Sequence, residues 1–402
     1  MHPSVQAGMD RVVADRRALH RIPEIAREEV LTAAYLEKQL REMGLSPRCG
    51  VGGTGLLCDL GSPDLGSPDL GSSDLGSSEP CTGGPLIALR ADMDGIRVEE
   101  RTGLPFASTH SGVMHACGHD GHMAMLLGAA RLFAANPPRN LRLRLIFQPA
   151  EEQFGGAQDL IRAGALNGVE RIFGAHLWSW LPTGTVASCA GPMMARTERV
   201  TIDIIGRGGH AALPRGTADA VVTASLLVTA LQTAVSRGVN PPGEPAILTI
   251  GELHAGSAPN VIAAKAQLCG TLRALTGEVM ETLRDSVRRI CAGIATTTGA
   301  AIDVTFTGGY PALVNHAGCV ESLKTAVARV ADFSPALPVM AGEDFSYYLQ
   351  AVPGCFFFIG AGDPSIPVET RGHHHEPVFD FDEDALAVGL EVWHELVREL
   401  DG

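Results

Sequence analysis

Residues 114–152 read MHACGHDGHMAMLLGAARLFAANPPRNLRLRLIFQPAEE. The stretch begins with a loop rich in histidine and continues with a helical pattern from Met123 to Ala135. It then holds a strongly apolar run from Leu141 to Phe147, which predicts a buried strand. A helix that leads into a buried strand is typical of an α/β layer with a mainly parallel sheet.

The rest of the chain extends this pattern in both directions. Short apolar runs at 56–60, 86–89 and 172–175 predict further strands, and the longer stretches between them predict helices. The N-terminal region predicts two helices separated at Pro23, and the C-terminal region predicts helices near 320–330 and 383–400 and a strand at 355–359. The predicted fold class is therefore α/β, with a mixed, mainly parallel sheet and flanking helices.

The order of elements changes between about residues 197 and 307. The predicted order is a strand at 200–205, a helix at 218–237, strands at 246–253 and 266–272, a helix at 276–297 and a strand at 301–307. This is the split βαβ order of a ferredoxin-like α+β domain. Because the α/β pattern resumes afterwards, we predict an inserted domain at 195–307 and a main domain made of residues 1–194 and 308–402.

Residues 61–80 contain a five-residue repeat of Gly, Ser, Pro or Ser, Asp and Leu. The repeat is too polar and flexible to pack, so we predict a low-complexity surface loop. A β-helix turn is the alternative, but about four short copies are too few to bury a core. Residues 50–55 match the pattern G-x-G-x-x-G, yet they precede a strand instead of joining a strand to a helix, which argues against a dinucleotide site.

Composition and charge exclude several classes of partner. The chain has 31 Lys and Arg against 45 Asp and Glu, a net charge of −14, and no basic block, so we expect neither nucleic acid nor a membrane surface as partner. No segment approaches the roughly 18 apolar residues of a membrane span, and we expect a cytoplasmic protein. The 9 cysteines are odd in number and scattered, as expected of reduced thiols.

The densest group of reactive side chains lies at 115–122, just before the predicted helix. It contains three histidines with Cys117 and Asp120. His and Cys are ligands for zinc-like metals, and Cys117 and His119 point the same way from an extended segment. The ordinary alternative is a solvated loop that caps the helix.

Three further segments carry candidate residues. Glu151 and Glu152 follow the strand at 141–147, where open α/β sheets place their ligands, and because adjacent side chains diverge, one can bind a metal while the other acts as general base. His176 ends a predicted strand, and three histidines occupy 373–375. Taken alone, each has an ordinary reading: a solvated pair at a helix start, a packed histidine, or an exposed loop.

Together these segments resemble the M20 metallopeptidase superfamily, and within it the amidohydrolase branch of hippurate hydrolases, N-acyl-amino-acid amidohydrolases and auxin-conjugate hydrolases. The most specific part is Cys-Gly-His-Asp-Gly-His with the Glu pair downstream. The resemblance implies a di-metal catalytic domain at 1–194 and 308–402, with 195–307 as an inserted lid that also pairs two subunits. The matching segments are 19–24, 90–94, 115–122, 148–152, 208–212, 258–261, 342–345 and 377–380.

The resemblance also implies roles for single residues. Glu151 would be the general base, and Asp94 would orient a ligand. The last ligand of the family lies two residues before a proline, which selects His375 from three successive histidines, where this chain departs from the usual Leu-His. The implied metal ligands are Cys117, His119, Glu152, His176 and His375.

By the same resemblance, the inserted domain supplies the remaining site residues. His210 would reach the active site of the partner subunit and polarise the scissile carbonyl. Asn260 and Arg273 would hold the substrate, since Arg is suited to a bidentate grip on a carboxylate. The chain departs from the family at Arg215, where a His is common, and after Asp219, which is followed by Ala instead of Pro.

The predicted function is hydrolysis of the amide bond of an N-acyl amino acid by a hydroxide held between two divalent metal ions, with Glu151 as base. Cys117 favours zinc, and Mn, Co and Ni are alternatives. The expected partners are the small substrate and a second copy of the chain in a homodimer. A dipeptidase or carboxypeptidase is the alternative enzyme, and a catalytically silent metal-binding protein is the alternative from another class. The acyl group, the amino acid and its stereochemistry are left open.

Overall fold

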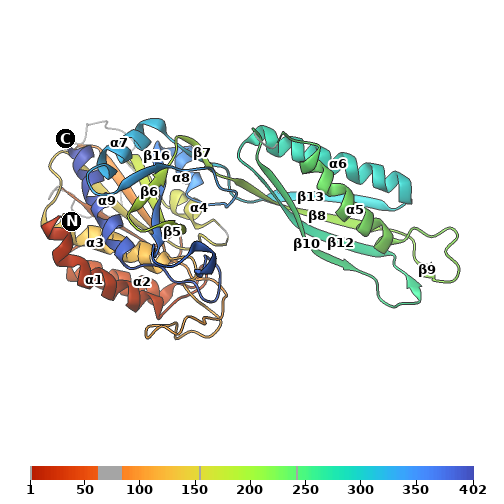
Figure 1. The fold of residues 1–402 in the computed structure, drawn as a ribbon, viewed down its shortest axis with the longest axis horizontal. Coiled ribbons are helices and arrows are strands. Elements are labelled where there is room, and N and C mark those ends of the chain that lie inside the picture. Colours follow the sequence, from red (N-terminus) through yellow and green to blue (C-terminus); the bar gives the residue numbers. More distant parts are fainter. Residues whose placement is uncertain (1, 62–83, 154, 241–242) are drawn as a thin grey trace, which may run out of the picture. The chain divides into compact units, whose positions relative to one another are not determined.

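The computed structural model describes residues 2–61, 84–153, 155–240 and 243–402 (Figure 1). The chain forms two compact units. The first consists of Met1–Gly191, Asn315–Leu337 and Tyr347–Gly402, and the second of Pro192–Val314 and Pro338–Ser346. The repeat predicted as a surface loop at 61–80 lies, except for Gly61, outside the described residues.

An eight-stranded sheet forms the centre of the first unit, in the order β1-β2-β4-β3-β5-β16-β6-β15. The four strands β4, β3, β5 and β16 are mutually parallel. β1 is antiparallel to β2, β2 to β4, and β6 to β16, whereas β15 is parallel to β6. The predicted mixed, mainly parallel sheet is confirmed. The strands are β1 (Arg48–Val51), β2 (Gly55–Leu60), β3 (Leu86–Asp92), β4 (Arg142–Gln148), β5 (Val169–Pro182), β6 (Thr185–Ser188), β15 (Asp332–Pro335) and β16 (Gly354–Gly362).

The central strands are buried along their length because helices cover the sheet. β3 and β16 have no exposed residue, and each of the three Phe in β16 contributes roughly 1.5–3 kcal/mol by its burial. This two-sided burial explains why the sequence shows continuous apolar runs instead of an alternating pattern. Helices α3 and α9 pack on the sheet and against α1 and α7. The helices are α1 (Pro3–His20), α2 (Val30–Glu42), α3 (His119–Ala135), α4 (Gly156–Arg162), α7 (Ala317–Val327), α8 (Ser346–Ala351), α9 (Asp384–Asp401) and the 3-10 turn η1 (Val368–Thr370).

A buried ion network ties α1 to the first turn of α3. Arg16 lies 3.0 Å from Asp120, 2.7 Å from Asp380 and 3.0 Å from Glu383, and His20 Nδ1 lies 2.9 Å from Asp120. Burial raises the pKa of the Asp120 carboxyl, but Arg16 and His20 outweigh it and hold that pKa well below its ordinary value. Because Asp120 directly follows His119, the network fixes the helix start that carries a predicted ligand.

The second unit is a four-stranded antiparallel sheet with α5 and α6, in the strand order β10-β12-β8-β13 (Figure 1). The chain passes through β8, α5, β10, β12, α6 and β13 in turn, which is the predicted ferredoxin-like order. Short two-stranded pairs, β9 with β11 and β7 with β14, complete the fold. The elements are β7 (Gly191–Met194), β8 (Arg196–Ile205), β9 (Gly209–His210), α5 (Ala220–Ser236), β10 (Ala246–Ala255), β11 (Val261–Ile262), β12 (Lys265–Ala274), α6 (Gly277–Thr298), β13 (Ala301–Gly308) and β14 (Leu313–Asn315).

One strand differs from its prediction. The sequence reading ended the strand at His176, but β5 continues to Pro182, because β16 pairs with it as far as that residue. His176 therefore lies within the strand and not at its end. In the described part of the chain, no helix is both long and apolar enough to cross a membrane.

Candidate metal centre

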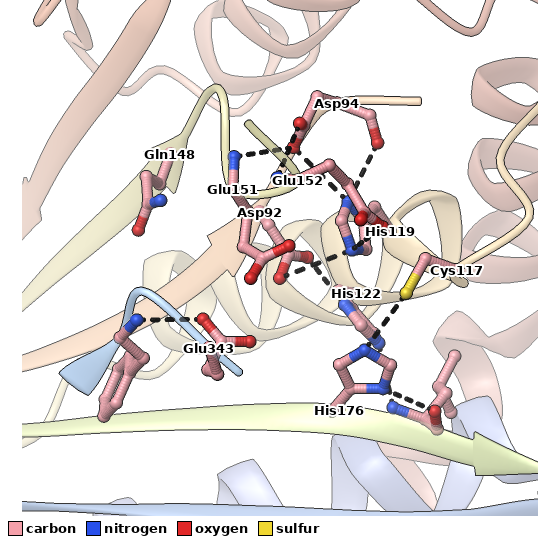
Figure 2. Close-up of polar contacts among 12 residues, drawn as sticks. Asp92, Asp94, Cys117, His119, His122, Gln148, Glu151, Glu152, His176 and Glu343 are labelled. Carbon is pink, nitrogen blue, oxygen red and sulfur yellow. Dashed lines mark hydrogen bonds and ion pairs between the residues drawn. The ribbon is translucent and has the colours of Figure 1, made fainter. Parts of the chain in front are cut away.

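Five segments of the first unit converge at one edge of its sheet, and Figure 2 shows the residues that follow β3 and β4 together with those on β5 and at the start of α3. β3, β4 and β5 are parallel neighbours, so the segments that follow β3 and β4 lie on the same side as the second half of β5. The start of α3 and the loop before Phe379 complete the group. The site residues on these segments are Asp92, Asp94, Cys117, His119, Glu151, Glu152, His176 and His375.

All five predicted ligands fall into two overlapping groups. The ligand atoms of Cys117, His119 and His176 lie within 4.8 Å of one another, and so do those of Cys117, Glu152 and His375. The Cys117 Sγ lies 3.4 Å from His176 Nε2. Cys117 is thus common to both groups, which is the arrangement that lets one thiolate serve two neighbouring metal ions.

Two glycines explain the spacing of the motif that supplies Cys117 and His119. Gly118 has a φ of 93°, a left-handed conformation that glycine adopts without strain. A Cβ on Gly121 would lie 2.4 Å from Leu177 Cδ1 and 2.7 Å from Phe381 Cζ. Gly118 therefore allows the tight turn at which α3 begins, and Gly121 allows α3 to approach β5 closely. Together they bring His119 opposite His176.

The ring orientations of two predicted ligands suit metal binding. The Nδ1 of His119 lies 2.8 Å from the carbonyl oxygen of Asp94, and the Nδ1 of His176 lies 2.6 Å from the carbonyl oxygen of Leu177. Since a carbonyl only accepts, both Nδ1 atoms donate, and in the neutral ring Nε2 keeps its lone pair. His119 Nε2 is buried and makes no hydrogen bond to the described residues. Its nearest acidic neighbours, Asp92 Oδ2 at 3.7 Å and Glu152 Oε1 at 3.9 Å, are too distant for a hydrogen bond, so a cation between them would give this nitrogen a partner.

Asp94 connects two of these segments. Its Oδ1 accepts the backbone N–H of Glu151 and its Oδ2 that of Glu152, both at 3.0 Å. Its backbone oxygen accepts His119 Nδ1, as noted above. One aspartate thus sets the ring orientation of His119 and the direction in which the Glu pair leaves β4.

Asp92 and His122 lie in segments that the sequence singled out, but neither was assigned a role, and both are buried in the site (Figure 2). His122 Nδ1 lies 2.6 Å from Asp92, and its Nε2 accepts the backbone N–H of Leu177 at 2.8 Å. Both ring nitrogens are therefore used, so His122 has none left for a metal. Asp92 also accepts from Arg90 at 2.6 Å and faces His119 Nε2 at 3.7 Å. The signal that could have found Asp92 is its place two residues before Asp94, on the same face of an extended segment.

The structure distinguishes the three successive histidines. His375 Nε2 lies 3.3 Å from Glu152 Oε1, and its side chain is 54% exposed. His373 uses both ring nitrogens, with Ser179 Oγ at 3.1 Å and the Val368 carbonyl at 2.9 Å. His374 accepts the backbone N–H of Ser179 at 3.2 Å. The ring of His374 lies near that of His176, with centroids 5.2 Å apart, but of the three histidines only His375 belongs to a described group of candidate ligand atoms.

Ser179 on β5 holds the histidine loop, a contact that no motif in the sequence indicates. Besides the contacts to His373 and His374, its carbonyl accepts from Arg371 at 3.1 Å. The neighbouring Trp180 stacks on the His373 ring, with centroids 4.6 Å apart and planes 2° from parallel. These contacts tie the loop to β5 just before it reaches His375, whose φ of 69° is unusual for a residue with a side chain.

The carboxylates make the site attractive to cations. Burial lowers the pKa of His119, but Asp92, Asp94 and Glu152 raise it to about 10. Burial, together with the charges of Glu152 and Glu151, raises the pKa of the Cys117 thiol well above its ordinary value. A positive ion at this position would replace the protons and relieve the repulsion between the acidic groups.

The predicted substrate-binding residues belong to the second unit. His210 is exposed on β9, and its Nδ1 accepts the backbone N–H of Ala212 at 3.1 Å. The backbone carbonyl oxygen of Asn260 accepts the backbone N–H of Ala211. Arg273 lies near the end of β12 and donates to the Met340 carbonyl at 2.7 Å. His210 and Asn260 are thus brought together, and Arg273 lies apart from them.

Residues 88–399 match the model of peptidase family M20/M25/M40. The chain belongs to this family. The N-acetyl-L-cysteine deacetylase of Bacillus subtilis (strain 168) is 38% identical over 395 residues, which cover 97% of this chain and 88% of that protein. Thermostable carboxypeptidase 1 of Saccharolobus solfataricus is 35% identical over 387 residues, 94% of this chain and 93% of that protein. A dinuclear metal binding peptidase from the M20 family of Bacillus subtilis has a crystal structure that matches with a TM-score of 0.80 and 31% identity, covering 98% of each chain.

Two predictions are thereby confirmed: membership of the M20 superfamily and a hydrolase that acts on amide bonds. The paired ligand groups of this M20 chain lie in the part that the family model covers. Arg16, which holds Asp120 from α1, precedes that part.

Proposed function

We propose that this enzyme hydrolyses the amide bond between an acyl group and the nitrogen of an amino acid, with Glu151 as general base. The observation that carries the proposal is the pairing of Glu151 with the two ligand groups. Asp94 fixes the backbone of both glutamates, so that Glu152 lies with Cys117 and His375 while Glu151 stands beside them, buried. A protein that only stored metal would have no use for the second carboxylate.

Two divalent metal ions fit the donor set. We propose that His119 and His176 would hold one ion and Glu152 and His375 the other, with Cys117, which belongs to both ligand groups, available to each. The orphaned Nε2 of His119 and the raised pKa of the Cys117 thiol support this assignment. When bound, such ions polarise a carbonyl and make a water molecule more acidic. The thiolate favours zinc, with Mn, Co and Ni as alternatives. The cytoplasmic location stays a prediction.

The side chains perform the proton transfers. Glu151 takes a proton from the attacking water and returns it to the leaving nitrogen. His210 donates to the oxygen of the scissile carbonyl, and because its Nδ1 accepts from Ala212, the neutral ring carries its proton on Nε2. Arg273 and Asn260 bind the carboxylate and polar groups of the substrate.

A hydrolysis screen tests the substrate class. With zinc or manganese loaded, we expect release of the free amino acid from N-acetyl and N-benzoyl amino acids, with kcat/KM at least about tenfold above that for a panel of dipeptides. A preference for dipeptides would favour the carboxypeptidase or dipeptidase alternative. A fully loaded protein that cleaves neither panel would be a silent metal binder, and the proposal would fail.

We further propose that two copies of the chain complete each site. On β12, Arg273 is eight residues from Lys265, roughly 26 Å at the usual rise of a strand. Lys265 pairs with Ile205, and His210 lies further on, where β9 extends past the end of the sheet (Figure 1). A single acyl amino acid is too small to touch Arg273 and His210 of one chain. If both bind substrate, one of them comes from a partner subunit.

Complementation between variants tests this dimer. His210→Ala and Glu151→Gln should each be inactive, yet their coexpression should restore about a quarter of wild-type activity. Random pairing makes half of the dimers mixed, and each mixed dimer has one intact site. The control mixes either variant with a catalytically silent chain that carries both changes, which leaves no intact site. Recovery no greater than in that control would show that His210 and Glu151 act within one chain.

A further inference from the structure

The turn that presents Glu151 and Glu152 has an unusual backbone. Ala150 has a φ of 58°, a left-handed conformation that residues with a side chain rarely adopt. Its carbonyl accepts the backbone N–H of Gly156 at 3.0 Å, and a Cβ on Gly156 would lie 1.8 Å from the Pro149 oxygen. The turn is therefore tightly folded immediately before the proposed base, and it needs support from outside to keep this form.

Two buried carboxylates supply that support by accepting three successive backbone N–H groups. Asp94 accepts those of Glu151 and Glu152, as described above. Glu29, which is 121 residues away in sequence, accepts the N–H of Ala150 through Oε1 at 2.9 Å. Glu29 is fully buried at the start of α2. It lies in the first unit with the rest of the site.

The remaining contacts of Glu29 keep its carboxylate in place. Oε1 also accepts the backbone N–H of Arg27 at 2.9 Å, and Oε2 accepts the Thr54 hydroxyl at 2.6 Å. All three partners donate to the carboxylate of Glu29. A replacement side chain must therefore accept from the two backbone N–H groups, and it must either accept from the Thr54 hydroxyl or donate to it. A buried carboxylate with such partners is held in one position.

From these contacts we infer that Glu29 is a positioning residue for the Glu151–Glu152 turn: its carboxylate holds Ala150 in the left-handed conformation and thereby sets the direction of the base and its neighbouring ligand. Only the kinetic effect expected from this inference rests on the proposed function. Its structural content is independent of the substrate: Glu29 holds the amide of Ala150 and thereby supports the turn whose next two amides donate to Asp94. Glu29 does not touch the reacting atoms and is not itself catalytic.

Three variants separate this role from a general effect on stability. Glu29→Ala removes the acceptor. Glu29→Gln keeps it, since the amide oxygen can accept from Ala150 and Arg27 while the NH₂ group donates to the Thr54 oxygen. Glu28→Ala changes the exposed neighbouring residue and is the matched control. Circular dichroism and metal content confirm that each variant is folded and loaded.

The first measurement is hydrogen exchange of the backbone amides of residues 150–152. We expect exchange in Glu29→Ala to be at least about tenfold faster than in the wild type, and unchanged in Glu28→Ala and Glu29→Gln. Unchanged protection in a folded Glu29→Ala protein would overturn the inference. If Glu29→Ala does not fold, a Glu29→Gln protein with fully exposed amides at 150–152 would overturn it equally, and retained protection would support it.

The second measurement is kinetic, on whichever substrate the wild-type enzyme cleaves. At saturating metal, we expect kcat of Glu29→Ala to fall about 10- to 100-fold with KM nearly unchanged, as for other residues that orient a metal site. Glu29→Gln should stay within about threefold of wild type. A rise in KM alone would contradict positioning of the base. If the wild-type enzyme cleaves no acyl amino acid, the proposed function fails, and hydrogen exchange still decides the role of Glu29.

Discussion

Glu151→Gln is expected to lower kcat by about two to four orders of magnitude while the metal content stays at the wild-type level. Gln has the shape of Glu but cannot take a proton from water. The backbone N–H of residue 151 would still donate to Asp94, so the turn and the neighbouring ligand Glu152 should keep their places. Steady-state kinetics together with metal analysis of the same sample measure both quantities.

Two comparisons sharpen this prediction. Glu170→Gln alters an exposed carboxylate on β5 of the same unit and should leave kcat unchanged. Glu152→Gln should instead reduce metal content, because Glu152 belongs to a ligand group with Cys117 and His375. Near-normal turnover of metal-loaded Glu151→Gln would show that another group serves as base.

The fold was largely predictable because its signals are local. The buried strands β3, β4 and β16 each contain a short apolar run, and α5 and α6 have helical patterns, so their type and order followed from the sequence. The short strands β6 and β15 gave no such signal, since a pairing partner elsewhere in the chain creates them. β5 also extends past His176, because β16 pairs with it as far as Pro182.

The site residues that lie in short motifs were predictable from the sequence. Those that contact the site from distant parts of the chain were not. Cys117, His119 and the Glu pair are dense local groups of chemically unusual residues. Glu29 looks like any carboxylate at a helix start, and its contact with Ala150 joins residues 121 apart. Ser179 likewise lies in no recognisable motif, and its contacts with His373 and His374 join residues far apart in the sequence. Long-range hydrogen bonds of this kind leave no periodicity or composition for a single sequence to reveal.

The resemblance to a family contributed the choice of His375, which the residue types alone left open. Three adjacent imidazoles are chemically equivalent in sequence. Their hydrogen bonds make them different: His373 and His374 bond to Ser179, whereas His375 faces Glu152. Whether a histidine nitrogen has a lone pair free for a metal depends on its hydrogen-bond partners. Those partners are set by the tertiary structure and cannot be identified from the residue type.

Cys117→Ala is expected to remove both proposed metal ions, because Cys117 is the one predicted ligand common to the two groups. Metal affinity should fall more than the roughly 10- to 100-fold typical of changes to residues that only orient ligands. His176→Ala removes a member of one group and should spare the other ion. Cys49→Ala removes an exposed thiol outside the site and is the control. Metal analysis after dialysis against a chelator measures the metal that the wild type and the three variants retain.

The pH dependence of metal binding tests the same assignment in a second way. Burial lowers the pKa of His119 but Asp92 raises it to about 10, and burial and the neighbouring glutamates raise that of the Cys117 thiol, so both groups carry protons at neutral pH until metal displaces them. Apparent affinity should therefore weaken as pH falls, by about a hundredfold per pH unit when two protons are released. In Cys117→Ala the slope for any residual binding should drop to about tenfold, because the thiol proton is no longer in competition. An unchanged slope would mean that Cys117 is not a ligand, whatever the loss in affinity.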